Sequence, residues 1–408
     1  MPSPSNCVIA GGGPAGIMLG LLLARAGVDV TVMEKHADFL RDFRGDTVHA
    51  STLRLLDELG LQQQFAELPQ RLIDSIRFRI EGVEVDIDFG QLPGAHKNMA
   101  LVPQWDLLEM LATAAEAEPS FRLLRNTEVV GVIRTADRVT GVTYHDENGQ
   151  TRDMPAALTV ACDGRSSTLR EAAGLVPQAF GAPMDVWWFR LPRHAGDPSG
   201  LAGVLVAGRA AITIDRGDYY QIAYIIPKGS DAQLRAAGIG ALRGNLVRMV
   251  PSLADRVDTL TSFDDVKLLD VQINRLRRWY TDGLLCIGDA AHAMSPVGGV
   301  GINLAVADAV AAARILARPL QTGRVSTRHL AEVQFRRWIP TAILQALQRT
   351  IHANLISIAV AGENADEKSR KPPAALKVVT SLPLLRRLGG YMVAMGPLPE
   401  HAPKYARR

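Results

Sequence analysis

The chain has 408 residues, of which 47% are hydrophobic and 21% charged, and its formal net charge is +3 at pH 7. This composition predicts two or three packed units with a sizeable core, and it excludes a disordered chain. The small, scattered excess of Lys and Arg argues against a protein that binds nucleic acid. Three cysteines without metal-site spacing predict buried thiols and a reducing, cytoplasmic location, with no metal centre.

The sequence predicts no membrane span. The first residues include no basic segment, and the apolar stretch 17–26 is shorter than the roughly 20 residues that cross a bilayer. That stretch also follows a glycine-rich turn, which is not typical of a signal peptide. We therefore expect a soluble protein.

The chain opens with the pattern strand, turn, helix, strand. Residues 7–10 are a short apolar strand, and residues 11–16 are a glycine-rich turn. A helix is expected over 17–26 with Gly27 as its C-terminal cap, followed by a mostly β-branched strand over 28–33. This pattern predicts one βαβ unit of a parallel sheet.

Further elements follow from the spacing of apolar residues. Two hairpins are expected over 76–89 and 128–145, helices over 105–117 and 303–316, buried strands over 157–161 and 284–287, and further strands over 186–191, 204–206, 211–214 and 219–226. The region 329–391 is expected to be helical, with an interruption at 366–373.

These elements predict an α/β (α+β) fold. A Rossmann-type nucleotide-binding domain is expected to be discontinuous, with a mostly antiparallel β substrate domain inserted and a helical C-terminus. The expected divisions are 1–72, 100–180 and 270–340 for the nucleotide-binding domain, 73–99 and 181–269 for the substrate domain, and 341–408 for the helical C-terminal segment.

The first motif is Gly11-Gly12-Gly13-Pro14-Ala15-Gly16, which matches G-x-G-x-x-G between a strand and a helix. Its glycines allow a tight turn, a close approach of a pyrophosphate and close packing of the helix on the strand. Glu34, followed by Lys35, ends the second strand, where an acid accepts hydrogen bonds from ribose hydroxyls. This motif alone does not separate FAD from NAD.

The second motif runs from Gly288-Asp289-Ala290-Ala291-His292 through Pro296 to Gly301-Ile302-Asn303. An acid at the end of a buried strand can hold a sugar-like hydroxyl. The glycines bring backbone close to a flat ligand, and the following helix N-terminus can stabilise the negative charge of a reduced flavin at N1/O2. The third motif, Asp163-Gly164-Arg165-Ser166-Ser167-Thr168-Leu169-Arg170, predicts a loop near the pyrophosphate.

Together the three motifs resemble those of the class A flavoprotein monooxygenases, the aromatic hydroxylases with a fold like that of para-hydroxybenzoate hydroxylase. The resemblance covers roughly residues 5–340. It implies tight, non-covalent FAD, with Asp289 at the ribityl hydroxyls and Pro296 beside the flavin ring. It also implies that the backbone N–H groups of Ile302 and Asn303 face flavin N1/O2.

The resemblance assigns three further residues to FAD. Arg44 matches an arginine near the flavin and the pyrophosphate, and Gln104 matches a position that contacts the ribityl-phosphate region. Val129 matches a position whose backbone meets the adenine.

The implied chemistry is that of a monooxygenase. In the family, NADPH or NADH reduces the flavin, O2 forms a flavin C4a-hydroperoxide, and one oxygen atom enters an aromatic, phenolic or polyketide substrate. The cofactor carries this chemistry, so no catalytic side chain is required, although His49 and Pro296 are possible helpers. Hydroxylation, epoxidation and Baeyer–Villiger insertion remain open, as does the choice between NADH and NADPH.

Candidates for substrate contact are Trp188, Arg190, Tyr220 and Tyr224 on the expected inserted sheet. The partner is expected to be a small organic molecule, and the protein a monomer or a homodimer. Three alternatives remain: a flavin-dependent halogenase, an FAD-dependent reductase on the same fold, and a non-enzymatic flavin carrier. The first is weakened because residues 187–192 match the halogenase element W-x-W-x-I-P only loosely.

Overall fold

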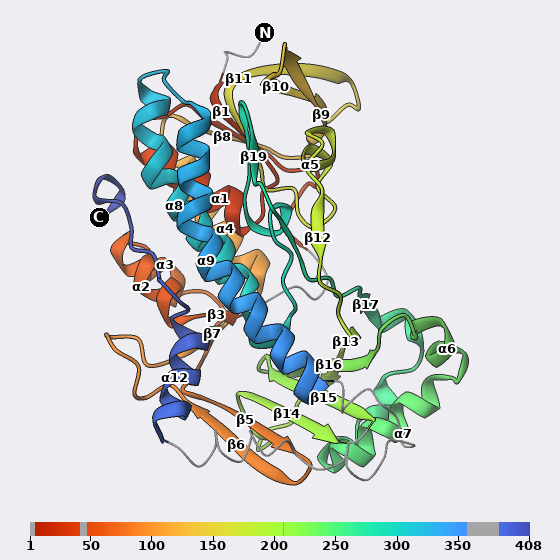
Figure 1. Ribbon diagram of the computed structural model, residues 1–408. Coiled ribbons are helices and arrows are strands. Elements are labelled where there is room, and N and C mark those ends of the chain that lie inside the picture. Colours follow the sequence, from red (N-terminus) through yellow and green to blue (C-terminus); the bar gives the residue numbers. More distant parts are fainter. Residues whose placement is uncertain (1–4, 41–46, 207, 357–382) are drawn as a thin grey trace.

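The computed structural model describes residues 5–40, 47–206, 208–356 and 383–408. Two large β-sheets lie at opposite ends of the molecule, and the long helices α8 and α9 run from the first sheet toward the second (Figure 1). The first sheet has eight strands with the main order β19-β20-β11-β1-β2-β8, and β10 and β9 join it through β11. Its strands are β1 (Ser5–Ala10), β2 (Val30–Met33), β8 (Phe121–Leu124), β9 (Glu128–Thr135), β10 (Arg138–His145), β11 (Thr151–Ala161), β19 (Tyr280–Thr281) and β20 (Leu284–Cys286).

The centre of this sheet is parallel and apolar. β1 pairs in parallel with β11 on one side and with β2 on the other. Cys7, Val8 and Ile9 are fully buried, as expected for a strand that is covered on both faces. α1 (Pro14–Arg25) packs against α4 (Gln104–Glu116) and α8 (Gly301–Gln321). In such sheets the loops at the carboxyl ends of the strands bind ligands.

The second sheet has seven strands in the order β17-β13-β16-β15-β14-β5-β6, and all its pairs are antiparallel except β14 with β5. Its strands are β5 (Ser75–Ile80), β6 (Val83–Asp88), β13 (Met184–Pro192), β14 (Leu201–Val206), β15 (Arg209–Asp215), β16 (Tyr219–Pro227) and β17 (Lys267–Leu269). One face packs on α7 (Ile239–Met249), which follows α6 (Asp231–Ala236). Apolar clusters on the other face include Val297 and residues of α12 (Pro383–Ala394).

Smaller elements connect the two sheets. They are β3 (Thr47–Val48), β4 (Arg71–Ile73), β7 (Met99–Leu101), β12 (Pro177–Ala179), β18 (Asn274–Leu276), α2 (Ala50–Glu58), α3 (Gln62–Ala66), α5 (Thr168–Ala172) and α9 (Thr327–Ile351), with a π-turn at His352–Ile356. Short 3₁₀ turns lie at Pro251–Leu253, Val257–Thr259, Phe263–Asp265, Gly288–Ala290, Val297–Gly299 and Lys404–Ala406.

The α/β fold with a second, antiparallel sheet and C-terminal helices is confirmed. Several details differ from the sequence prediction, among them the following three. The first helix begins at Pro14 rather than at residue 17, because proline suits the first helical turn. The strand expected at 157–161 begins at Thr151, since its first half pairs with β10 and its second half with β1. The helices α6 and α7 were not predicted, and they cover one face of the second sheet.

The C-terminal region follows the prediction in part. α9 and α12 are helical, whereas the last residues after α12 carry only one 3₁₀ turn. The predicted interruption at 366–373 lies outside the described residues. The domain boundaries stay a proposal, and α9 crosses the last of them, at residue 340, without a break.

One described segment, 297–321, is long and apolar enough to span a bilayer by length and composition. Of its most apolar window, 72% is buried inside the protein. It includes α8, which packs against α1 and α9, so its apolar character is accounted for by the core.

Candidate functional site

The turn between β1 and α1 contains glycines at which a Cβ atom would clash with the protein and one at which it would not. Gly11 has a φ of +101°, and a Cβ atom there would lie 2.4 Å from the carbonyl oxygen of Cys162. A Cβ at Gly16 would lie 2.0 Å from the carbonyl oxygen of Gly11. A Cβ at Gly13 would meet no atom within 4 Å. The fold itself therefore requires Gly11 and Gly16, whereas Gly13 leaves open space in front of the helix.

This open space lies at the N-terminus of α1. Pro14 occupies the first helical position, where its missing N–H needs no partner. The N–H groups of Ala15 and Gly16 are in the first turn and have no acceptor within the helix. The space at Gly13 and these donors together form a cradle that fits a pyrophosphate.

Glu34 is held beside this cradle. It follows the last residue of β2 and is 7% exposed. Its carboxylate accepts hydrogen bonds from the backbone N–H of Gly12 at 2.9 Å and of His36 at 3.1 Å. These two bonds hold the carboxylate beside the cradle, where an acid can accept a hydrogen bond from a ribose hydroxyl. Lys35 next to it is exposed.

The loop from Asp163 to Arg170 follows β11. Asp163 accepts a hydrogen bond from the backbone N–H of Leu169 at 3.1 Å, and burial raises the pKa of this carboxyl. Ser167 caps α5 by accepting from the N–H of Arg170. The buried guanidinium of Arg170 donates to the carbonyl oxygens of Ala290 at 3.1 Å and Arg165 at 2.7 Å. Arg170 thus ties the third motif to the second.

The second motif also contacts the first. A Cβ at Gly288 would lie 3.2 Å from Cβ of Ala15, so the loop after β20 runs close to the start of α1. Asp289 is 32% exposed, and its carboxylate lies 3.5 Å from the guanidinium of Arg165. An accessible carboxylate at this place can accept hydrogen bonds from ribityl hydroxyls, as the sequence predicts.

A buried ionic network supports this loop from behind. Asp308 of α8 accepts from the Gly288 N–H at 3.1 Å, from His292 Nε2 at 2.6 Å and from Arg337 Nε at 2.9 Å. None of the three side chains is more than 2% exposed. Burial acts to raise the pKa of Asp308, but His292 and Arg337 outweigh it, so this pKa lies below its ordinary value. The role of His292 is therefore to position the loop.

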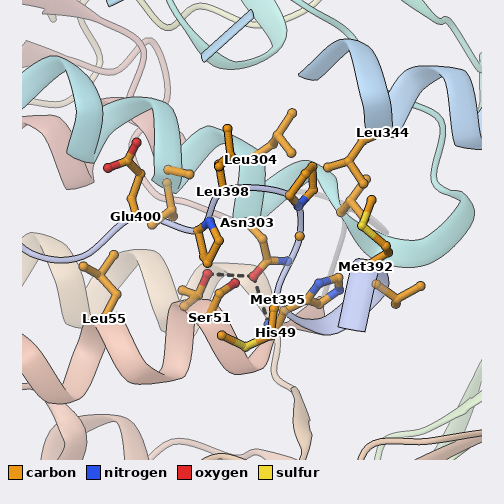
Figure 2. Close-up of a pocket in the computed structure, with 18 of the residues that line it drawn as sticks. His49, Ser51, Leu55, Asn303, Leu304, Leu344, Met392, Met395, Leu398 and Glu400 are labelled. Atoms are coloured by element: carbon orange, nitrogen blue, oxygen red, sulfur yellow. Dashed lines mark hydrogen bonds between the residues drawn. The ribbon is translucent and has the colours of Figure 1, made fainter. Parts of the chain in front are cut away.

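Asn303 connects the N-terminus of α8 with α2. Its Oδ1 accepts from the His49 N–H at 2.9 Å and from Thr52 Oγ1 at 2.7 Å, as the dashed lines in Figure 2 show. Its Nδ2 donates to the Thr47 carbonyl at 3.1 Å. The first-turn N–H groups of Gly301, Ile302 and Asn303 stay free of helical partners, so they can face a developing negative charge.

His49 is 2% exposed and burial lowers its pKa to about 4, so its imidazole is neutral near pH 7. It lines a pocket between α2, α8, α9 and residues 392–400 (Figure 2). Met392 and Met395 lie close to the imidazole in this view, and Glu400 lies at the other end. The C-terminal segment therefore forms one wall of the pocket.

Several predicted FAD residues have a known position but no tested role. Gln104 is the first residue of α4, and Val129 lies in β9 opposite Tyr144. Pro296 is partly buried directly before the 3₁₀ turn Val297–Gly299. Arg44 lies outside the described residues. The contacts of these four residues with FAD stay predictions.

The four predicted substrate residues do not lie together. Successive residues of a strand point to opposite faces of a sheet. Tyr220 and Tyr224 lie in the apolar cluster that packs on α7, whereas Trp188 borders the clusters on the opposite face. Tyr220 and Tyr224 therefore do not share a sheet face with Trp188, and contact of any of these residues with substrate stays a prediction. Arg190 is exposed and lies over the ring of Tyr219 at 4.8 Å.

The structure also reveals positioning residues that the sequence did not single out. Arg170 was named as a motif residue without its bonds to the second motif, and Thr52, Asp308 and Arg337 were not named. A buried acid inside the apolar helix α8 was the one available signal, at Asp308. Among the described residues, no group of three His, Cys, Asp or Glu side chains could hold a metal ion.

The motifs converge in the way that FAD requires. The open cradle at Gly13, the fixed carboxylate of Glu34, the accessible carboxylate of Asp289 and the N-terminus of α8 fit, in that order, the pyrophosphate, ribose, ribityl chain and flavin ring.

Comparison with known proteins agrees with this fit. A family model described as an FAD binding domain matches residues 5–346. The chain is 35% identical to 6-methylpretetramide 4-monooxygenase of Streptomyces rimosus over 339 residues, which cover 81% of this chain and 79% of that protein. It is 32% identical over 320 residues to the 12-dehydrotetracycline 5-monooxygenase/anhydrotetracycline 6-monooxygenase of Streptomyces rimosus subsp. rimosus, covering 75% of this chain and 61% of that protein.

Among solved structures, p-nitrophenol 4-monooxygenase PnpA from Pseudomonas putida DLL-E4 superposes with a TM-score of 0.79 at 20% identity. The match covers 97% of this chain and 99% of that one. At this identity, the likeness establishes the fold alone.

Proposed function

The chain belongs to the FAD-dependent monooxygenases of the aromatic-hydroxylase type, and from that premise we propose that it inserts one oxygen atom of O2 into an aromatic polyketide. The substrates for which two relatives are named support this substrate class. We propose NADH or NADPH as the reductant, a cytoplasmic location, and a monomer or homodimer.

The observation that carries the proposal is the position of Val297. It follows Pro296 directly and packs into an apolar cluster that includes Val186, Ile225 and Ile212 of the seven-stranded sheet. An apolar sheet face therefore borders the loop that is assigned to the flavin ring. A flat, largely apolar substrate lying on this face would be beside the ring.

When bound, FAD supplies the electron and oxygen chemistry. The residues of this chain hold and orient it: the first turn of α1 binds the pyrophosphate, Glu34 the ribose and Asp289 the ribityl hydroxyls. The first turn of α8 stabilises negative charge on the ring. The apolar residues around Val297 exclude water from the substrate. No side chain of the site is required as a nucleophile.

The test is anaerobic reduction of the purified, FAD-loaded protein by NADPH and by NADH. Each is measured alone, with 6-methylpretetramide, with anhydrotetracycline and with p-nitrophenol. We expect one of the two polyketides to accelerate bleaching of the flavin absorbance, and admission of O2 to give a product heavier by one oxygen atom. Mass spectrometry with ¹⁸O2 identifies the source of that atom.

Other outcomes contradict the proposal in distinct ways. Flavin reduction without any oxygenated product in the presence of O2 would indicate a reductase. If neither nucleotide reduces the flavin but dithionite does, an external reductase is needed, as in halogenases. Oxygenation of p-nitrophenol alone would keep the monooxygenase and replace the substrate class.

A further inference from the structure

Two adjacent tryptophans of β13 have opposite surroundings. Trp187 lies in the apolar cluster beside α7, with its ring 5.3 Å from that of Phe263. Its indole N–H donates to the carboxylate of Asp231 at 2.6 Å. Trp188 points to the other face, as the alternation of a strand requires. The pair therefore allows one chemical group, the indole N–H, to be compared on the two faces of one strand.

The indole N–H of Trp188 has no such acceptor in the part of the chain that the structure describes. Its Nε1 atom is buried and makes no hydrogen bond to these residues. A buried tryptophan usually finds an acceptor for this donor, and leaving it without one is unfavourable. The residue is only partly buried as a whole, so it is not enclosed in a tightly packed core. The unpaired donor is available to an acceptor from outside the protein.

Trp188 stands where such an acceptor would be part of the substrate. It borders two apolar clusters of this sheet face. One cluster includes Val297, next to Pro296 of the flavin loop, and the other includes Tyr391 and Val393 of α12. These clusters supply ring and aliphatic contacts, and no oxygen of the described residues accepts from the indole N–H. They match a flat molecule that carries a polar oxygen at one edge.

We propose that Trp188 is a specificity-determining residue whose Nε1–H donates a hydrogen bond to a carbonyl or phenolic oxygen of the aromatic polyketide. This inference rests on the proposed function and sharpens it to a substrate with an oxygen acceptor at the edge that meets β13. The indole N–H is a donor only, so it selects for an acceptor. A site built around such a donor discriminates against analogues that lack the oxygen.

The experiment compares Trp188→Phe with the matched variant Trp187→Phe in the FAD-loaded protein. Both changes keep an aromatic ring and remove one N–H. With 6-methylpretetramide as the probe, we expect Trp188→Phe to raise KM about tenfold, the effect of one lost hydrogen bond, with a smaller change in kcat. Trp187→Phe should leave KM within about twofold, because its N–H serves Asp231 on the far face.

Thermal unfolding without substrate gives a second readout, in which Trp187→Phe should have the larger effect. Trp188→Phe removes part of a packed ring but no hydrogen bond within the protein, so the melting temperature should fall less than in Trp187→Phe. Trp187→Phe removes the donor to Asp231, so the melting temperature should fall. FAD content of both variants, measured by absorbance, shows that they are folded.

The outcomes separate this inference from the proposed function. If the wild type binds and oxygenates 6-methylpretetramide but Trp188→Phe leaves KM unchanged, this inference fails and the proposed function stands. A fall in melting temperature for Trp188→Phe that is larger than the fall for Trp187→Phe would also overturn it, because the N–H would then have a partner within the protein. If the wild type neither binds nor oxygenates any polyketide, both fail together.

Discussion

The two large sheets of this protein differ in what forms their proposed ligand sites. At the eight-stranded sheet, backbone groups form most of the proposed FAD site. They belong to the turn at Gly11–Gly16, the first turn of α1 and the first turn of α8. At the seven-stranded sheet, the proposed substrate site is formed by side chains on one of the two sheet faces. Trp188 lies on the face beside Val297, whereas Tyr224 lies on the face beside α7.

This difference explains what each region tolerates. Backbone that approaches a ligand closely leaves no room for a Cβ atom, so individual glycines become obligatory. A sheet face tolerates exchange of apolar residues of similar volume, and its specificity rests on a few polar atoms. A shared FAD site can therefore be combined with a substrate face that varies.

The largest effect is expected from substituting glycines of the first turn, and it should differ between Gly16 and Gly13. Gly16→Ala places a Cβ 2.0 Å from the Gly11 carbonyl oxygen, so we expect a loss of several kcal/mol and a protein isolated without FAD. Gly13→Ala meets no protein atom within 4 Å, so the apoprotein should keep its stability. Its Kd for FAD should rise at least tenfold, since the methyl group enters the pyrophosphate cradle.

Urea unfolding of the apoproteins and FAD titration by fluorescence check both expectations. The backbone account of this site fails if Gly13→Ala binds FAD as tightly as the wild type. It also fails if Gly16→Ala retains wild-type stability.

The buried network behind the second motif should give the next largest effect. Asp308→Asn removes the charge that pairs with Arg337 and leaves this guanidinium buried without its main partner. We expect a loss of about 3–5 kcal/mol in the free energy of unfolding, measured with urea. A matched control is Asp86→Asn on β6, whose exposed pair with Arg77 should contribute less than about 1 kcal/mol. Equal losses would mean that the network does not support the loop.

Sequence reasoning succeeded where a backbone contact dictates residue type, as at Gly11 and Gly16. The role of Glu34 at the ribose stays a prediction. Sequence reasoning could not choose between Trp188 and the pair Tyr220 and Tyr224, because a strand buried on both faces is apolar at nearly every position. The alternation of side chains along such a strand then does not indicate which sheet face meets the flavin loop. The pairing of Asp308 with Arg337 depends on how α9 packs on α8, and no local pattern encodes that.

His49 lies at the border of the two regions and should give a pH-dependent effect. Its pKa is about 4 in the folded protein against an ordinary value of 6.5, so only the unfolded chain binds a proton between these values. Stability is then complete above pH 6.5 and falls as the pH drops toward 4, by about 3 kcal/mol from this residue. His49→Gln should remove that part of the pH dependence, which urea unfolding between pH 4 and 8 measures. Parallel curves for variant and wild type would show that burial does not shift this pKa.

The smallest expected effect is that of Tyr224→Phe. The tyrosine packs with Trp187 at a ring distance of 6.1 Å on the α7 side of the sheet, so its hydroxyl cannot meet a ligand on the Trp188 face. We expect kcat and KM with 6-methylpretetramide to stay within about twofold of the wild type, and stability to change by about 1 kcal/mol or less. Steady-state kinetics of Tyr224→Phe and Trp188→Phe, measured side by side, compare the two faces of the same sheet. A rise in KM for Tyr224→Phe equal to that for Trp188→Phe would show that the substrate reaches the α7 face, and the division between the two faces would then be wrong.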